Sequence, residues 1–307
     1  MIISASRRTD IPAFFSEWFY NRIRDGIIKT RNPYNYHQVN QVNLYPDEID
    51  CIVFWTKNAK PMLDKLDLLR EYNYYFQYSI TPYPAAYEPN LTDLSRKVET
   101  FIQLSEKIGK DRVIWRYDPI LISDDIDLSF HLKMFDKLSQ SLSKHTFRCI
   151  ISFIDLYNTT KANTKGLNIR EMDDNQNRLI AQELVPIANH YGLELHTCAE
   201  RIDLEDIGIS HGKCIDDELI SRLIRKPLNI PKDPNQREEC GCIKSFDIGA
   251  YNTCQNGCKY CYATRNHKSV LSNKKNHDPS SPFLIGNSTD RDHVNIRNKT
   301  NQTYIQF

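Results

Sequence analysis

The chain has 307 residues, with 40 Lys and Arg against 39 Asp and Glu, which gives a formal net charge of +1. A balance so close to zero gives no general attraction to an anionic membrane surface and lends no support to a nucleic-acid partner. No apolar run approaches the ~20 residues that a membrane-spanning helix needs. The first residues also lack the pattern of a signal peptide. We therefore expect a cytoplasmic protein with no membrane partner.

Six short apolar segments, rich in β-branched and aromatic residues, are predicted to be strands: 2–6, 50–56, 74–81, 112–117, 149–155 and 193–200. Their nearly continuous apolar character is typical of parallel strands covered on both faces. Between them, apolar residues recur every three or four positions and predict helices over 12–26, 61–72, 91–109, 127–142, 171–191 and 216–225. Residues 27–48 are predicted to form an excursion with a hairpin.

This alternation indicates an α/β fold with a parallel sheet, either doubly wound or a full or partial barrel. We favour a TIM-like, six-stranded partial β/α barrel over 1–226, with two further strands from the C-terminal part as the less favoured alternative. Residues 227–285 are predicted to be a cysteine-rich segment that packs on the barrel mouth. Residues 286–307 form a polar tail, and we expect the last ~20 residues to be poorly ordered.

The chain contains nine cysteines. Because thiols stay reduced in the cytoplasm, we interpret them as metal-binding or redox groups instead of disulfides. Three of them form a CxxxCxxC motif, Cys254, Cys258 and Cys261. Three thiolates at this spacing can bind three irons of a 4Fe–4S cluster and leave the fourth iron open. Gly257 suits the sharp bend that such a loop requires. Zinc is the main competitor, but its common sites use CxxC pairs and four closed ligands.

The stretch IGAYNTCQNGCKYCYATR, which includes Tyr260 before the third cysteine, resembles the cluster loop of the radical SAM superfamily. From SASRRTDIPAFFSEWF through FWTKN, VIWRYDPIL, ISFIDLY and QREECGC to CYA, the chain resembles the bacterial DUF1848 family, whose function is unassigned. The resemblance covers about residues 1–285. It implies that the three cysteines hold a 4Fe–4S cluster whose open iron binds S-adenosylmethionine. Reduction by a partner such as flavodoxin or ferredoxin would then yield a 5′-deoxyadenosyl radical.

The chain departs from the superfamily pattern in order, because the motif follows the sixth strand instead of the first. The glycine-rich, acidic stretch expected after the second strand is also absent, and Thr56-Lys57-Asn58 stands in its place. These departures leave the cluster ligands in place but remove the pattern that would identify the residues contacting S-adenosylmethionine.

Polar residues at strand ends are candidates for the remaining roles, because ligands of parallel α/β sheets bind at the carboxyl ends of the strands. Arg116, Asp118 and Lys57 are the predicted catalytic residues; Arg116 and Asp118 share parity, and the competing interpretation is an internal ion pair. The predicted cofactor-binding residues are Thr56, Asn58, Ser152, Glu200 and Tyr260.

A second metal site is suggested by four further cysteines, Cys198, Cys214, Cys240 and Cys242, which would suffice for another iron–sulfur cluster or for zinc. A lone strand cysteine is more often a small buried hydrophobe, which is our interpretation of Cys51 and Cys149.

Two functions follow from these residues. The first is a radical-SAM-type enzyme acting on an unknown substrate. The second is a non-catalytic iron–sulfur or zinc protein, in which the metal fixes the C-terminal segment over the barrel and the chain serves as a binding module. Metal-free hydrolysis is disfavoured, because no nucleophile elbow or HExxH motif is present.

Overall fold

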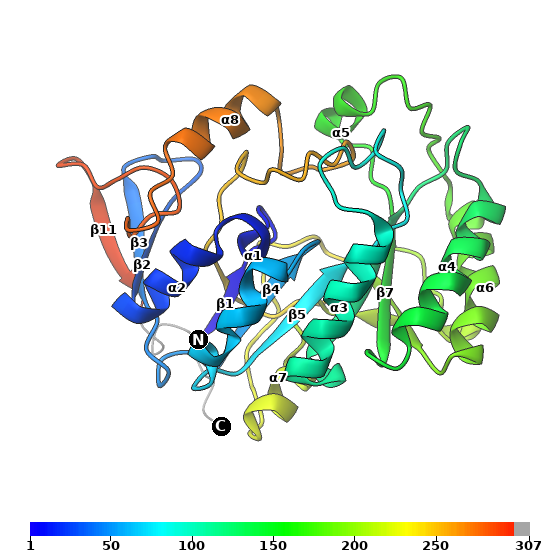
Figure 1. The fold of residues 1–307 in the computed structure, drawn as a ribbon, viewed down its shortest axis with the longest axis horizontal. Coiled ribbons are helices and arrows are strands. Elements are labelled where there is room, and N and C mark those ends of the chain that lie inside the picture. The colour runs from blue at the N-terminus through cyan, green and yellow to red at the C-terminus, as the bar shows by residue number, and fades with distance from the viewer. Residues whose placement is uncertain (298–307) are drawn as a thin grey trace.

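The computed structural model describes residues 1–297, and its centre is a single parallel sheet (Figure 1). All six predicted strands are confirmed and pair in chain order: β1 (Ile2–Ala5), β4 (Cys51–Thr56), β5 (Tyr74–Ser79), β6 (Val113–Ile120), β7 (Arg148–Phe153) and β8 (Glu194–Cys198). Every neighbouring pair is parallel. The carboxyl ends of these strands therefore meet along one rim.

The favoured prediction of six strands was wrong, because the sheet has eight. β9 (Ser210–Gly212) pairs in parallel with β8, and β10 (Phe246–Asp247) pairs in parallel with β1. Of these two further strands, only β10 comes from the C-terminal part, as the alternative expected. These two short strands are the two edges of the sheet and do not pair with each other, so the sheet does not close into a barrel. With three and two residues, they are too short to produce a hydrophobic pattern. β10 also places part of the cysteine-rich segment inside the main sheet.

Helices cover one face of the sheet at the positions that the periodicity predicts (Figure 1). They are α1 (Ile11–Phe14), α2 (Ser16–Asp25), η1 (Lys60–Leu69), α3 (Leu94–Ile108), α4 (Leu128–Leu142) and α6 (Asp174–His190). The predicted helix over 12–26 is divided at Phe15, and the segment over 61–72 is a 3₁₀ helix. Short helices not predicted are η2 (Lys110–Arg112), α5 (Asn158–Asn163), η3 (Glu205–Ile207) and α8 (His267–Lys275).

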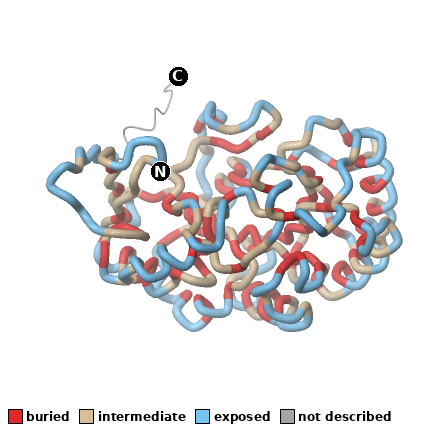
Figure 2. The backbone as a smooth tube through the Cα atoms, turned by 90° about the horizontal axis from the view of Figure 1, so that it is seen from above, coloured by how far each residue is buried: buried red, intermediate tan, exposed pale blue. Residues whose placement is uncertain are grey.

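The opposite face of the sheet is filled by the chain itself. Tyr75 and Ile114 point to this face and pack against residues between 214 and 243, including those of α7 (Asp217–Ile224). On the helix-covered face, Phe54 and Phe76 stack with ring centroids 4.7 Å apart. Both faces of the central strands are therefore buried, which explains their unbroken apolar sequences. Figure 2 shows buried residues through the interior of the molecule and exposed ones mostly at its periphery.

A small second sheet lies beside the first, where β2 (Ile27–Arg31) and β3 (Gln38–Asn43) form the predicted antiparallel hairpin. β11 (His293–Arg297) pairs in parallel with β3. This strand corrects the prediction of a poorly ordered tail for the part that it covers, because Arg31 forms an ion pair with Asp292 at 2.7 Å beside it. The rest of the predicted tail, 298–307, lies outside the described residues. Within 1–297, no helix combines the length and apolarity needed to cross a membrane.

His131 on α4 gives the fold a pH dependence. Its Nε2 lies 2.8 Å from the Leu121 carbonyl, which can only accept, so Nδ1 accepts from the Tyr117 hydroxyl at 2.9 Å. Burial lowers the pKa of His131 below its ordinary value. Unfolding then takes up a proton below pH ~6.5, so stability is present above that pH and is lost as pH falls. Between pH 7.5 and 5.5, denaturant titrations should show the wild type losing about 1 kcal/mol more unfolding free energy than His131→Gln loses, whereas the exposed His190→Gln should follow the wild type.

Candidate metal centre

Seven of the nine cysteines line one cavity of about 470 Å³ at the carboxyl ends of the strands: Cys198, Cys214, Cys240, Cys242, Cys254, Cys258 and Cys261. The volume lies in the usual range of ~300–1,000 Å³ for small-molecule and cofactor sites. Cys51 and Cys149 are fully buried in β4 and β7 and do not line the cavity, as predicted for core residues.

The loop that carries the CxxxCxxC motif is tied to its surroundings by backbone hydrogen bonds. Its two ends meet through Asn252 N and Ala263 O, 2.9 Å apart. Lys259 N donates to Tyr87 O at 2.9 Å, and Asn90 Nδ2 donates to Gln255 O at 2.8 Å. The three cysteines are thus presented to the cavity by a loop that the rest of the chain holds in place.

Gly257 has φ +72°, the left-handed conformation that the bend between the first two cysteines requires. A Cβ there would lie 2.9 Å from Asn90 Nδ2 and 3.2 Å from Pro89 Cγ. Gly257→Ala should therefore displace the loop and lower the amount of iron taken up when the protein is incubated anaerobically with iron and sulfide. The matched control is Gly192→Ala, since Gly192 has φ +68° and open space around its Cβ position. The control should cost about 1–2 kcal/mol in an unfolding titration and leave iron content unchanged; equal iron loss in both variants would contradict the steric explanation.

Two thiols of the motif, those of Cys254 and Cys258, have raised pKa values in the absence of metal. Burial raises the pKa of Cys254 well above its ordinary value, and the nearby Asp10, Cys261 and Cys258 raise it further. Burial also raises the pKa of Cys258 to about 12, although the Lys57 ammonium acts in the opposite direction. Metal coordination removes thiol protons, so a bound cation would act against these upward shifts in pKa.

Asp10 links three parts of the site. Its carboxylate accepts from the Thr56 hydroxyl at 2.7 Å, from Lys57 N at 2.8 Å and from Asn256 Nδ2 at 3.0 Å. It also caps α1 by accepting from Ala13 N. A single buried carboxylate thereby fixes the end of β4 against the cysteine loop, and its pKa is raised by burial.

Glu88 forms the second link, and no sequence pattern marks it because it lies in the loop between β5 and α3. Its carboxylate contacts Lys57 Nζ at 2.8 Å and Lys97 Nζ at 3.1 Å, and it accepts from the Tyr260 hydroxyl. The two lysines lower the pKa of the buried Glu88 to about 2 against the opposing effect of burial. One carboxylate thus joins Lys57, after β4, to Tyr260 of the cysteine loop.

The other four cysteines form a group of their own, which we call the four-thiol group. Cys198 Sγ and Cys214 Sγ are 3.0 Å apart, and the backbone N atoms of Cys214 and Ile215 donate to Cys242 Sγ at 3.2 and 3.4 Å. Hydrogen bonding with Cys242 lowers the pKa of Cys240 to about 7. Segments separated by up to 44 positions, from Cys198 to Cys242, therefore come together at the same cavity.

Two arginines give this part of the cavity a positive environment. Arg116 Nη1 donates to Cys214 Sγ at 2.9 Å, and Arg7 Nη2 is buried with no hydrogen-bond partner in the described chain. Burial acts to lower the pKa of Arg7, but the thiols of Cys242 and Cys214 raise it above its ordinary value. An unpaired buried guanidinium is costly unless an anionic group shares the space.

Of the remaining predicted site residues, four line the cavity and two do not. Arg116 Nε donates to Asp118 Oδ2 at 3.0 Å, and this internal ion pair lines the cavity together with Ser152 and Thr56. Two other residues do not line the cavity: Asn58 accepts from Lys60 N, at the first residue of η1, at 3.0 Å, and Glu200 accepts from Phe153 N at 2.8 Å. Burial raises the pKa of Glu200 to about 7.

Within residues 1–297, no three His, Cys, Asp or Glu side chains surround a point that a single metal ion could occupy. An iron–sulfur cluster is a larger body than one ion, and its ligands surround a cube. The thiols, the hydrogen-bond donors to sulfur and the unpaired guanidinium are the groups that such an anionic cluster requires.

A family model described as "Domain of unknown function (DUF1848)" matches residues 2–263. No curated protein matches the chain, and no solved structure matches it. The matched range contains both groups of cysteines.

Proposed function

The chain belongs to the DUF1848 family, and from its site we propose that it is a radical-SAM-type enzyme. The observation that carries this proposal is the division of the seven thiols into a set of three and a set of four. Cys254, Cys258 and Cys261 lie on one loop, whereas the four-thiol group is bonded within itself. Three thiolates leave one iron of a 4Fe–4S cluster without a protein ligand.

When bound, that cluster would supply an open iron for the amino and carboxylate groups of S-adenosylmethionine and the electron that cleaves it. The chain's own residues would position and shield these groups. Lys57 places a positive charge near Cys258. Its Nζ atom lies 5.7 Å from the centroid of the Tyr260 ring. Arg7 offers an unbonded Nη2 to an anionic group, and Arg116 is held by Asp118 at the same cavity. Ser152 and Thr56 complete this polar lining.

For the four-thiol group we propose a second, auxiliary iron–sulfur cluster. Its sulfurs already accept hydrogen bonds from Arg116 and from two backbone N atoms, which are contacts that stabilise ligating thiolates. Four protein ligands close this site, so the auxiliary cluster would not bind S-adenosylmethionine.

A non-catalytic metal protein is the second candidate, and the closed four-thiol group is the observation that favours it. A structural metal at that point would fix residues 240–242 against 214–215, where Ile243 N already donates to Ile215 O at 3.3 Å. Zinc, which prefers four closed thiolates, is the alternative to iron for this role, and binding one zinc ion would require the four sulfurs to move closer together.

The two candidates differ in their reaction with S-adenosylmethionine. Protein reconstituted anaerobically with iron and sulfide, then reduced, should release 5′-deoxyadenosine from S-adenosylmethionine. The Cys242→Ala variant tests whether the four-thiol group is needed for loading, and the Cys261→Ala variant should release none. Tightly bound zinc that iron does not displace from either group would overturn the proposal.

A further inference from the structure

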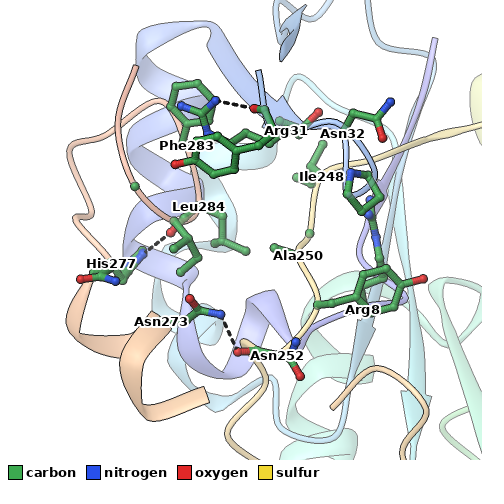
Figure 3. Close-up of a pocket in the computed structure, with 18 of the residues that line it drawn as sticks. Arg8, Arg31, Asn32, Ile248, Ala250, Asn252, Asn273, His277, Phe283 and Leu284 are labelled. Carbon is green, nitrogen blue, oxygen red and sulfur yellow. Dashed lines mark hydrogen bonds between the residues drawn. The ribbon is translucent and has the colours of Figure 1, made fainter. Parts of the chain in front are cut away.

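A second and larger cavity, of about 1120 Å³, opens beside the metal centre, between the small sheet, α8 and residues 248–252 (Figure 3). It exceeds the ~300–1,000 Å³ of ordinary small-molecule sites. Arg31 and Phe283 stand at one end of it and Arg8 on the opposite side, while Asn273 Nδ2 donates to Asn252 O at 3.0 Å at its lower edge. Arg8, Tyr157 and Tyr262 line both cavities, so the two are adjoining.

Tyrosines are concentrated on the wall of this cavity. Five of the six exposed tyrosines in the described chain line it: Tyr34, Tyr36, Tyr157, Tyr251 and Tyr262. Tyr34 is 95% exposed, and its ring takes part in no aromatic pair with another described residue. Exposed aromatic rings gathered on one wall are surfaces on which flat ring systems stack.

The charge of the wall is strongly positive although that of the whole chain is close to zero. Five cations line the cavity, Arg8, Lys29, Arg31, Arg265 and Lys275, against one carboxylate, Asp278. Arg8 and Arg31 are engaged with Asp247 and Asp292, at 2.9 and 2.7 Å. Lys29, Arg265 and Lys275 form no ion pair with a described carboxylate, so their charges are available to an anionic ligand.

We propose that this cavity binds a short stretch of single-stranded nucleic acid as the substrate of the adjoining metal centre. The proposal rests on the proposed function for the reaction, but the binding itself does not depend on it. Cations that follow a phosphate backbone, combined with tyrosines on which successive bases stack, are the two parts of a single-strand site. The size of the cavity and the number of tyrosines fit several nucleotides better than one. The sequence alone does not indicate a nucleic-acid partner, because the residues of the cavity wall come from segments that lie far apart in the chain.

Binding can be measured by fluorescence anisotropy with a labelled eight-nucleotide deoxythymidine strand and the reconstituted full-length protein. Tyr34→Ala should weaken binding about five- to tenfold, as expected for the loss of one stacked base. The exposed Tyr45→Ala, away from the cavity, should have no effect. Lys29→Gln and Lys275→Gln should each reduce the slope of log affinity against log salt by roughly 0.7, the value for one phosphate contact on a single strand. Lys144→Gln, an exposed lysine elsewhere, should leave the slope unchanged.

Each outcome decides between the alternatives. Binding of the strand with these variant effects supports the proposal, whether or not S-adenosylmethionine is cleaved. No binding of the strand, or equal weakening by the cavity and control variants, overturns it, even if 5′-deoxyadenosine is released. Equal competition by thymidine monophosphate would also overturn it in favour of a mononucleotide site.

Discussion

Replacing Cys258 by alanine should reduce the iron of the reconstituted protein from about eight to about four atoms per chain and abolish release of 5′-deoxyadenosine. Two 4Fe–4S clusters account for eight irons, and the variant retains only the one in the four-thiol group. The side chain of Cys258 lines the cavity beside Lys57, so its removal eliminates a ligand without opening the main core. Iron and sulfide analysis together with chromatography of the nucleoside products provides the measurement.

Two further variants make this result specific. Cys51→Ala removes a fully buried thiol from β4 that does not line the cavity, so it should keep about eight irons and full activity. Cys242→Ala removes a member of the four-thiol group and should also leave about four irons, but those of the other cluster. Eight irons in Cys258→Ala would show that the CxxxCxxC motif does not hold a cluster.

The Glu88→Gln variant should lose about 3–5 kcal/mol of unfolding free energy. Glu88 is 3% exposed and its carboxylate neutralises Lys57 and Lys97, of which Lys97 is 4% exposed. Removing one partner of a buried ion pair leaves an uncompensated charge, which is strongly destabilising. The same change weakens the contact to the Tyr260 hydroxyl, so the cysteine loop should loosen as well. Urea titrations of the wild type and the variant at pH 7.5 provide the measurement.

Glu106→Gln is the matched control for this variant. Glu106 lies on α3, as Lys97 does, but it is exposed to solvent. Its substitution should change the unfolding free energy by less than about 0.5 kcal/mol. If Glu88→Gln were no more destabilising than Glu106→Gln, the buried carboxylate would not be what holds the two lysines.

The sequence predicted the parts of this fold that depend on local periodicity. The central strands such as β4 and β5 read as apolar runs because both of their faces are buried, and α3 and α4 read as amphipathic stripes. β9 and β10 escaped prediction because strands of three and two residues depend on their neighbours for their conformation. The open sheet follows from these short edges, and no local pattern reports it.

The site was predictable only where the chemistry lies in the residue type and the spacing. The motif cysteines could be identified because three thiols lie close together in sequence. The members of the four-thiol group are spread over 44 positions, so the sequence could only suggest that they form one site. Glu88 was missed because a single glutamate in a loop looks like any solvated one until its partners are known. The cavity wall with Tyr34 and Lys275 was missed for the same reason.

The most direct test of the account is the electron paramagnetic resonance spectrum of the reduced, fully loaded protein with and without S-adenosylmethionine. The proposal places an open iron on the cluster of Cys254, Cys258 and Cys261, so addition of S-adenosylmethionine should change the signal of that cluster. The change should persist in Cys242→Ala, which keeps this cluster, and be absent in Cys258→Ala. A fully loaded protein whose spectrum is the same with and without S-adenosylmethionine would contradict the radical-SAM function.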